Sequence, residues 1–173
     1  HEAVVGEKPK GWYTGRCSQA TIDLVAEQGI CTYQADSYAD DLPYYQDTPS
    51  GPQLMVPYTL DANDMRFATP QGFNSGQQFF DYLKDTFDGL YEEGCSGKAR
   101  MMSIGLHCRL AGRPGRLQAL RAFVDYAAQK TGVWFATRLD IATCWQAAYP
   151  YQPGFRPSLL DRREFVSLLG SVY

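Results

Sequence analysis

Segments with strand patterns alternate with segments of helical pattern along most of the 173 residues. Short apolar or alternating runs predict strands, and apolar residues spaced three and four apart predict helices. The expected strands cover 11–16, 30–35, 54–58, 101–106 and 133–136, and the expected helices cover 18–29, 75–94, 117–127 and 139–148. This order predicts an α/β fold with a mostly parallel sheet and outer helices, either a barrel or a doubly wound sheet. The strands are too few to close a barrel of about eight.

Two long connections interrupt the alternation. Residues 42–52 contain three prolines and are expected to form a loop. Residues 59–74 are irregular, and their aromatic and apolar content favours an ordered, functional loop. We expect residues 1–149 to form the α/β unit, and residues 150–173 to form a tail rich in proline and aromatic residues that carries a short helix.

Composition excludes several classes of protein. Hydrophobic residues make up 45% of the chain and aromatic residues 14%, which argues for a folded protein. A net charge of −3 gives no basic footprint for nucleic acid. No apolar run approaches the roughly 20 residues of a membrane helix. The five cysteines include no CxxC pair, so we expect free thiols in the cytoplasm and no zinc site formed by cysteines.

Residues 101–112 combine a predicted strand, residues able to do acid–base chemistry and a glycine that ends the strand. The apolar run that begins at Met101 ends in His107, Cys108 and Arg109, and Gly112 then breaks the chain. We interpret this as a buried strand with His107 at its carboxyl end, where ligands bind in parallel α/β folds. The only other histidine is at the amino terminus, so His107 is the candidate for acid–base chemistry near neutral pH. The alternative is a structural histidine that caps the strand.

Polar side chains follow several of the expected strands. The four clusters are Arg16; Asp36 with Asp40 and Asp41; Asn63 with Asp64 and Arg66; and His107 with Arg109. In a parallel fold, all four clusters are expected on the same face, where a carboxylate can orient a histidine and an arginine can bind a substrate oxygen. This suits acid–base hydrolysis of an amide-like bond. Taken separately, the clusters also fit a solvated acidic loop, a turn cap and surface ion pairs.

Four of these stretches also carry a resemblance to a known family. The stretches are Lys8–Arg16, Asp36–Pro43, Val56–Phe67 and Gly105–Arg109. Together they resemble the polysaccharide deacetylase superfamily, in the branch of cofactor-independent allantoinases and chitin-deacetylase-like sequences. The resemblance runs from about Gly6 to Trp145 and implies part of a deformed (β/α) barrel. It also implies hydrolysis of a carbon–nitrogen bond other than a peptide bond, in an N-acetyl group or a cyclic ureide such as allantoin.

The resemblance implies roles for individual residues. His107 matches the family's catalytic acid, and Leu106 matches an apolar wall beside it. Asp36 is the matching carboxylate expected to tune the histidine, and Arg16 is expected to organise the site. Trp12 is expected to line it.

The family's amino-terminal motifs are not found in the chain. Those motifs supply the catalytic base and, where metal is used, an aspartate and two histidines. The chain therefore resembles the carboxyl-terminal half of such a domain. We expect no cofactor, with zinc only in the presence of the missing half, and a small ureide or N-acetylated sugar as substrate. The alternative is a non-catalytic fragment that binds ligand, or that completes its barrel with a partner chain or a second copy.

Overall fold

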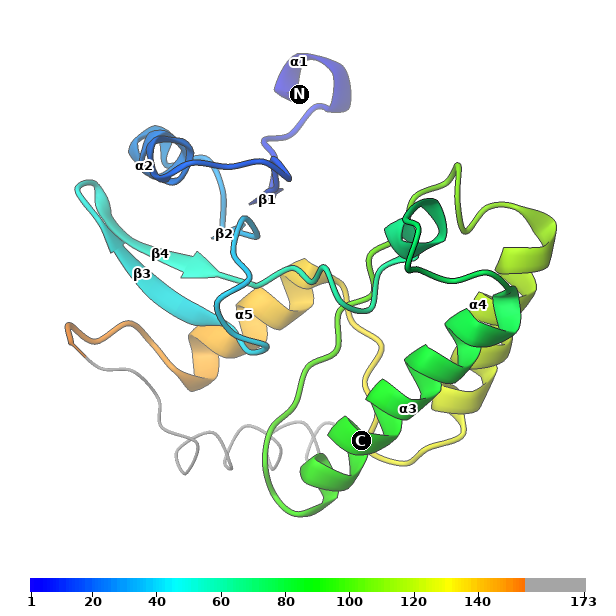
Figure 1. Cartoon of the computed structure of the whole chain (residues 1–173). Coiled ribbons are helices and arrows are strands. Elements are labelled where there is room, and N and C mark those ends of the chain that lie inside the picture. The colour runs from blue at the N-terminus through cyan, green and yellow to red at the C-terminus, as the bar shows by residue number, and fades with distance from the viewer. Residues whose placement is uncertain (155–173) are drawn as a thin grey trace. The chain divides into compact units, whose positions relative to one another are not determined.

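A computed structural model describes residues 1–154 and shows two compact units (Figure 1). Unit 1 comprises His1–Tyr58 with residues 135–154, and unit 2 comprises Thr59–Trp134. Unit 1 contains α1 (Glu2–Val5), β1 (Gly11–Trp12), α2 (Gln19–Gln28), β2 (Tyr33–Gln34), β3 (Tyr44–Thr48), β4 (Gly51–Met55) and α5 (Arg138–Ala148). Unit 2 contains the 3₁₀-helix η1 (Asp64–Ala68), α3 (Gly76–Cys95) and α4 (Pro114–Ala128). The expected helix in the tail lies outside the described residues.

The sheet of unit 1 has the strand order β1-β2-β4-β3. Strand β2 pairs in parallel with both β1 and β4, whereas β3 and β4 form an antiparallel hairpin. This mixed sheet with its helices confirms the predicted α/β class. The hairpin contradicts the loop predicted for residues 42–52. Gly51 turns the chain with a φ of 111°, and its carbonyl oxygen accepts a hydrogen bond from Thr48 Oγ1.

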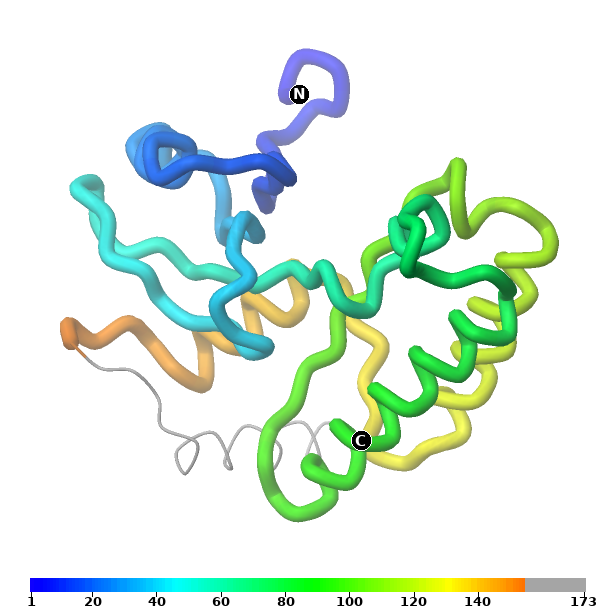
Figure 2. The backbone as a smooth tube through the Cα atoms, in the orientation of Figure 1, coloured from blue at the N-terminus to red at the C-terminus, as the bar shows by residue number. Residues whose placement is uncertain are grey.

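The helices of unit 1 follow the local sequence signals. Ser18 and Thr21 form a reciprocal capping box at the start of α2, and Gly29 ends the helix in the left-handed region. Thr137 and Asp140 cap α5 in the same way. The chain leaves unit 1 after Tyr58 and returns after Trp134, so α5 joins β1–β4 from a distant part of the sequence (Figure 2).

Unit 2 is built on two long helices. Helices α3 and α4 pack against each other, and aromatic side chains fill the core beside them. The rings of Phe67, Phe73 and Phe79 have centroids 5.3–5.4 Å apart, mostly in edge contacts. Phe79 and Leu83 are fully buried on α3, as the predicted apolar face requires. This core supports the irregular segment that precedes α3.

Two predicted strands are wrong. Residues 101–106 are extended but form a single bridge, between Gly105 and Asn63, and residues 133–136 form no strand. The apolar pattern is present in both, but a strand also needs a neighbour that pairs with its backbone. The expected strands 11–16 and 30–35 shorten to two residues each for the same reason. In residues 1–154, no helix has the length and apolar character needed to cross a membrane.

Candidate active site

Asp64, at the start of η1, is a buried residue of unit 2 whose side chain has several hydrogen-bond partners. Asn63 caps this helix, because its Oδ1 accepts a hydrogen bond from the Met65 N–H at 2.9 Å. The single bridge between Asn63 and Gly105 then fixes the position of the Asp64 backbone. The Asp64 N–H donates to the Gly105 carbonyl, and the Gly105 N–H donates to the Ala62 carbonyl, at 2.9 and 2.8 Å. The Asp64 side chain is thereby placed beside the turn that follows residue 106.

The Asp64 carboxylate binds His107 at both the ring and the backbone. Its Oδ1 lies 2.6 Å from His107 Nδ1, and its Oδ2 accepts from the N–H groups of His107 and Ala111 at 2.8 and 2.9 Å. Asp64 has no exposed surface, whereas the His107 side chain keeps 29% of its surface exposed. A buried acceptor therefore orients a ring that ligands can still reach.

This arrangement determines the protonation of the imidazole. An ionised carboxylate can only accept hydrogen bonds, so the proton of the neutral ring sits on Nδ1. Nε2 makes no hydrogen bond to any of the residues 1–154 and can take up or release a proton. The pair is suited to general acid–base work.

Asp36, the carboxylate predicted to tune His107, lies in unit 1, so its position relative to the His107 ring stays a prediction. The carboxylate on the His107 ring is that of Asp64, where the sequence predicted Asp36. Asp36 is 4% exposed, and its two oxygens accept hydrogen bonds from the N–H groups of Thr14 and Gly15 at 2.7 and 2.9 Å. Asp36 therefore stabilises the turn after β1. The sequence did place Asp64 and His107 in two of the four clusters, but it did not pair them.

The arginines of the clusters have different surroundings. Arg16 is exposed and makes no hydrogen bond or ion pair with any described residue. The Arg66 guanidinium lies 4.4 Å from the ring centroid of Tyr82 and 4.8 Å from that of Phe73, so it packs as part of unit 2. Arg109 is exposed and contacts Met65 Sδ at 3.6 Å. Of the predicted arginines, Arg109 is the nearest to His107 along the chain, and its side chain is exposed to solvent.

The other predicted substrate-binding residues are partly structural. Asp40 Oδ1 accepts hydrogen bonds from the N–H groups of Asp41 and Leu42, which closes a turn, and Asp41 is exposed. The Trp12 indole N–H donates to Thr14 Oγ1 at 2.9 Å, and the residue is 39% exposed. Leu106 is exposed next to His107. Because the four clusters are divided between the two units, their convergence on one face stays a prediction.

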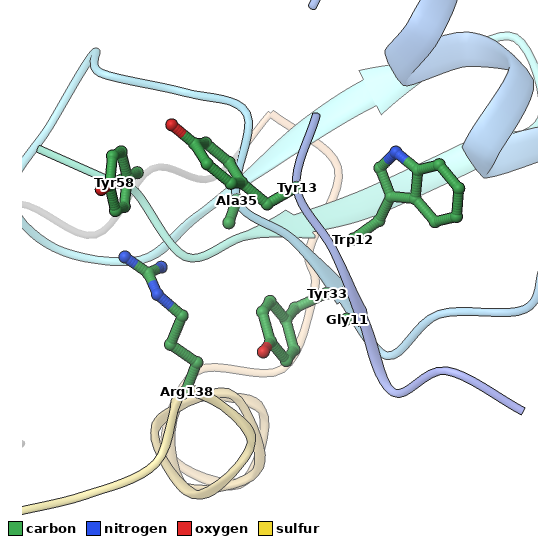
Figure 3. Close-up of a pocket in the computed structure, with 7 residues that line it drawn as sticks. All are labelled: Gly11, Trp12, Tyr13, Tyr33, Ala35, Tyr58 and Arg138. Carbon is green, nitrogen blue, oxygen red and sulfur yellow. The ribbon is translucent and has the colours of Figure 1, made fainter. Parts of the chain in front are cut away.

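Arg138 was missed in the sequence. It is the first residue of α5, and its guanidinium donates to the Val56 and Pro57 carbonyls at 2.6 and 2.9 Å. Arg138 lines a hollow in unit 1 together with aromatic residues of the sheet (Figure 3). The signal was a charged residue two positions after the apolar run 133–136, close to the pattern that singled out His107.

Candidate metal ligands are not clustered in the part of the chain that the structure describes. Residues 1–154 contain no group of three or more histidine, cysteine, aspartate or glutamate side chains placed to bind a metal. All five cysteines are unpaired in the structure. Burial raises the pKa of the Cys31 and Cys144 thiols, whereas Cys95 and Cys108 are exposed.

The chain is similar to several known proteins. It is 44% identical over 158 residues to a Schizosaccharomyces pombe protein named as a polysaccharide deacetylase, a match that covers 83% of this chain and 49% of that protein. The chain therefore spans about half the length of the curated relative it matches. No family model matches the chain.

Solved structures similar to the chain are also about twice its length. A Pseudomonas aeruginosa PAO1 protein titled as a polysaccharide deacetylase is 54% identical with a TM-score of 0.83, covering 87% of this chain and 51% of that one. The PuuE allantoinase is 55% identical with a TM-score of 0.83, covering 87% and 50%. A Mycobacterium smegmatis structure at 23% identity and a TM-score of 0.74 shares the fold. These matches confirm the predicted fold class, part of a (β/α) barrel.

Proposed function

Because the chain belongs to the polysaccharide deacetylase family, we propose that it provides the proton-transfer group of a hydrolase that cleaves a carbon–nitrogen bond other than a peptide bond. The observation that carries the proposal is the pairing of His107 with the fully buried Asp64. A histidine that merely caps a strand needs no buried carboxylate on its ring nitrogen. It also needs no partly exposed ring.

In the proposed step, His107 acts as the general acid. Water adds to the carbonyl carbon and gives one proton to a base, which we assign to the half of the longer relatives that this chain does not match. The carbon–nitrogen bond then breaks, with its electron pair moving to the leaving nitrogen. Protonated His107 donates the Nε2 proton to that nitrogen, so that an amine leaves instead of an amide anion. Asp64 accepts the hydrogen bond of the Nδ1–H group and so orients the ring for the transfer. Leu106, exposed beside the histidine, suits the apolar wall of such a site.

Two substrate classes follow from the names of the relatives. One relative is named an allantoinase and the others polysaccharide deacetylases, so the substrate is a cyclic ureide or an N-acetylated sugar. We propose that the described residues bind no metal of their own, because they contain no suitable cluster of ligands. Any zinc requirement then belongs to the half of the longer relatives that this chain does not match. A cytoplasmic location and assembly with a partner chain or a second copy stay predictions.

The test is a turnover assay with two histidine variants. Hydrolysis of allantoin and acetate release from N-acetylated chitin oligomers are measured with and without zinc. The chain is assayed alone and mixed with the part of the PuuE allantoinase that it does not match. In the mixture, we expect turnover of at least one substrate. His107→Ala should reduce the rate of this turnover by about 10²–10⁴-fold. The matched control, His1→Ala, removes the exposed terminal histidine and should retain full activity.

Two results would contradict the proposal. Turnover that survives His107→Ala would remove His107 from the chemistry. A complete lack of turnover on both substrates, with the added segment present, would instead favour a chain that binds ligand without converting it.

A further inference from the structure

Arg109 lies on the turn that carries His107. The N–H groups of Leu110 and Ala111 donate to the His107 carbonyl at 2.9 and 3.0 Å, so residues 107–111 form a tight turn. Two residues this close in sequence have Cα atoms at most about 7 Å apart. Both residues belong to unit 2, so their spacing is determined within that unit.

One short segment of unit 2 orients both side chains. Arg109 Nη2 lies 3.6 Å from Met65 Sδ, and Met65 is itself 40% exposed. In the preceding residue, Asp64 Oδ1 lies 2.6 Å from His107 Nδ1. An exposed guanidinium and a partly exposed imidazole are therefore anchored on adjacent residues.

Arg109 has no carboxylate partner among residues 1–154. Its contact with the thioether of Met65 is its one side-chain hydrogen bond in this part of the chain, and a thioether is a weak acceptor. The acidic side chains of the same segment have other partners. Asp61 lies 3.7 Å from Arg66, and both oxygens of Asp64 are used by the turn at residues 107–111. The remaining N–H donors of the guanidinium are available to a ligand.

The two substrate classes differ at the leaving nitrogen. In an N-acetylated sugar, this nitrogen is otherwise attached to a sugar carbon. In a cyclic ureide such as allantoin, it is also attached to the urea carbonyl. When the carbon–nitrogen bond of a ureide breaks, the electron pair on the nitrogen is delocalised onto the urea oxygen until the proton arrives. A hydrogen-bond donor at that oxygen would stabilise the leaving group of a ureide, and a sugar offers no such oxygen.

We propose that Arg109 is a specificity-determining residue that donates to the urea oxygen of a cyclic ureide and so favours this class over N-acetylated sugars. The inference rests on the proposed function, in which His107 gives its Nε2 proton to the leaving nitrogen. Because the two side chains share one turn, an oxygen two bonds from that nitrogen lies within reach of the guanidinium. Arg109 keeps its own protons throughout. A site that hydrogen-bonds one group of a substrate discriminates strongly against an analogue that lacks this group.

The binding test compares hydantoin, the ring of a cyclic ureide, with pyrrolidinone, which has the amide carbonyl but no urea carbonyl. Binding to the full chain, mixed with the segment used in the turnover assay, is measured by ligand-observed NMR. We expect Arg109→Met to weaken hydantoin about tenfold and to leave pyrrolidinone unchanged, and Arg109→Lys to retain part of the affinity. The matched control, Arg121→Met, changes an exposed arginine of α4 that makes no side-chain interaction in the described chain and should bind hydantoin normally.

Turnover separates this inference from the proposed reaction. Arg109→Met should lower kcat/KM for allantoin at least tenfold, with acetate release unchanged and the melting temperature unchanged because Arg109 is exposed. If His107→Ala abolishes allantoin hydrolysis but a folded Arg109→Met does not slow it, the proposed function stands and the role of Arg109 is wrong. If no substrate is turned over but hydantoin binding still depends on Arg109, the reaction is wrong and the recognition of ureides stands. Equal binding of hydantoin by the wild type and Arg109→Met would overturn the inference.

Discussion

Two replacements of Asp64, by alanine and by asparagine, should differ in their effects on the free energy of unfolding and on the His107 tautomer. Asp64→Ala leaves the partly buried N–H group of His107 and the buried N–H group of Ala111 without their acceptor. An unsatisfied buried donor costs about 1–3 kcal/mol, so the variant should lose about 2–6 kcal/mol. Asp64→Asn keeps an acceptor for both N–H groups. It converts two charge-assisted hydrogen bonds into neutral ones, at about 1 kcal/mol each, and should lose about 2 kcal/mol.

The asparagine variant should also reverse the imidazole. Its amide oxygen must face the two backbone N–H groups, because an NH₂ group there would set donors against donors. The NH₂ group then faces His107 Nδ1 and donates to it, which moves the ring proton to Nε2. The wild type should carry the neutral proton on Nδ1 instead.

Two measurements check this reasoning. Urea unfolding with a constant m-value gives the loss of stability in each variant. Nitrogen-15 NMR of histidine-labelled protein gives the tautomer, with His1→Ala used to assign the two ring systems. If alanine and asparagine destabilise equally, or if the His107 tautomer is the same in the wild type and Asp64→Asn, then Asp64 does not act as described.

Three further predictions concern other parts of the chain. Asp36→Ala should lower stability by about 2 kcal/mol or more in urea unfolding, because it leaves two N–H groups of the turn after β1 without an acceptor; an unchanged midpoint would contradict this. Hydrogen bonds from the Thr137 side chain and backbone lower the pKa of Asp140, so its contribution is present above the unfolded pKa and is lost as the pH falls through the folded pKa. Melting curves should therefore show that the stability gap between wild type and Asp140→Asn narrows below pH 4, and a constant gap would count against the capping box. Thiol labelling at neutral pH should modify the exposed Cys108 faster than Cys144, whose pKa is raised by burial, and a disulfide in the non-reduced mass spectrum would contradict free thiols.

The helices were predictable because their signals are local. Ser18 and Gly29 bound α2, and Ser75 caps α3, as the sequence indicated. Capping groups and apolar faces act within one or two turns of a helix, so neighbouring residues determine them. The strands depend on partners elsewhere in the chain. Residues 101–106 have a strand pattern, but they form only one bridge.

The sequence predicts a loop where β3 and β4 form a hairpin, because prolines occur in this segment. Pro49 lies in the turn, and Pro52 lies at the start of β4, opposite Asp47 of β3. Proline is compatible with the first residues of a strand, where a missing N–H removes little pairing. Proline content alone therefore did not distinguish a loop from a hairpin.

The chemistry of the site was predictable by residue type but not by pairing. The sequence identified His107 as the candidate acid and included Asp64 among the polar clusters. Asp36 and Asp64 each follow an expected strand, and the pattern gives no reason to prefer either as the partner of His107. The choice depends on backbone geometry, since the bridge between Asn63 and Gly105 places Asp64 beside residue 107. Contacts 43 residues apart leave no local trace in the sequence.

A double-mutant cycle on turnover tests most directly whether Asp64 acts through His107. The rates of allantoin hydrolysis and acetate release are compared for the wild type, Asp64→Asn, His107→Ala and the double variant, with the added segment present. We predict that Asp64→Asn reduces turnover on its own, and that it causes no further loss when His107 is already alanine. Losses that multiply in the double variant, or an active Asp64→Asn enzyme, would contradict the account.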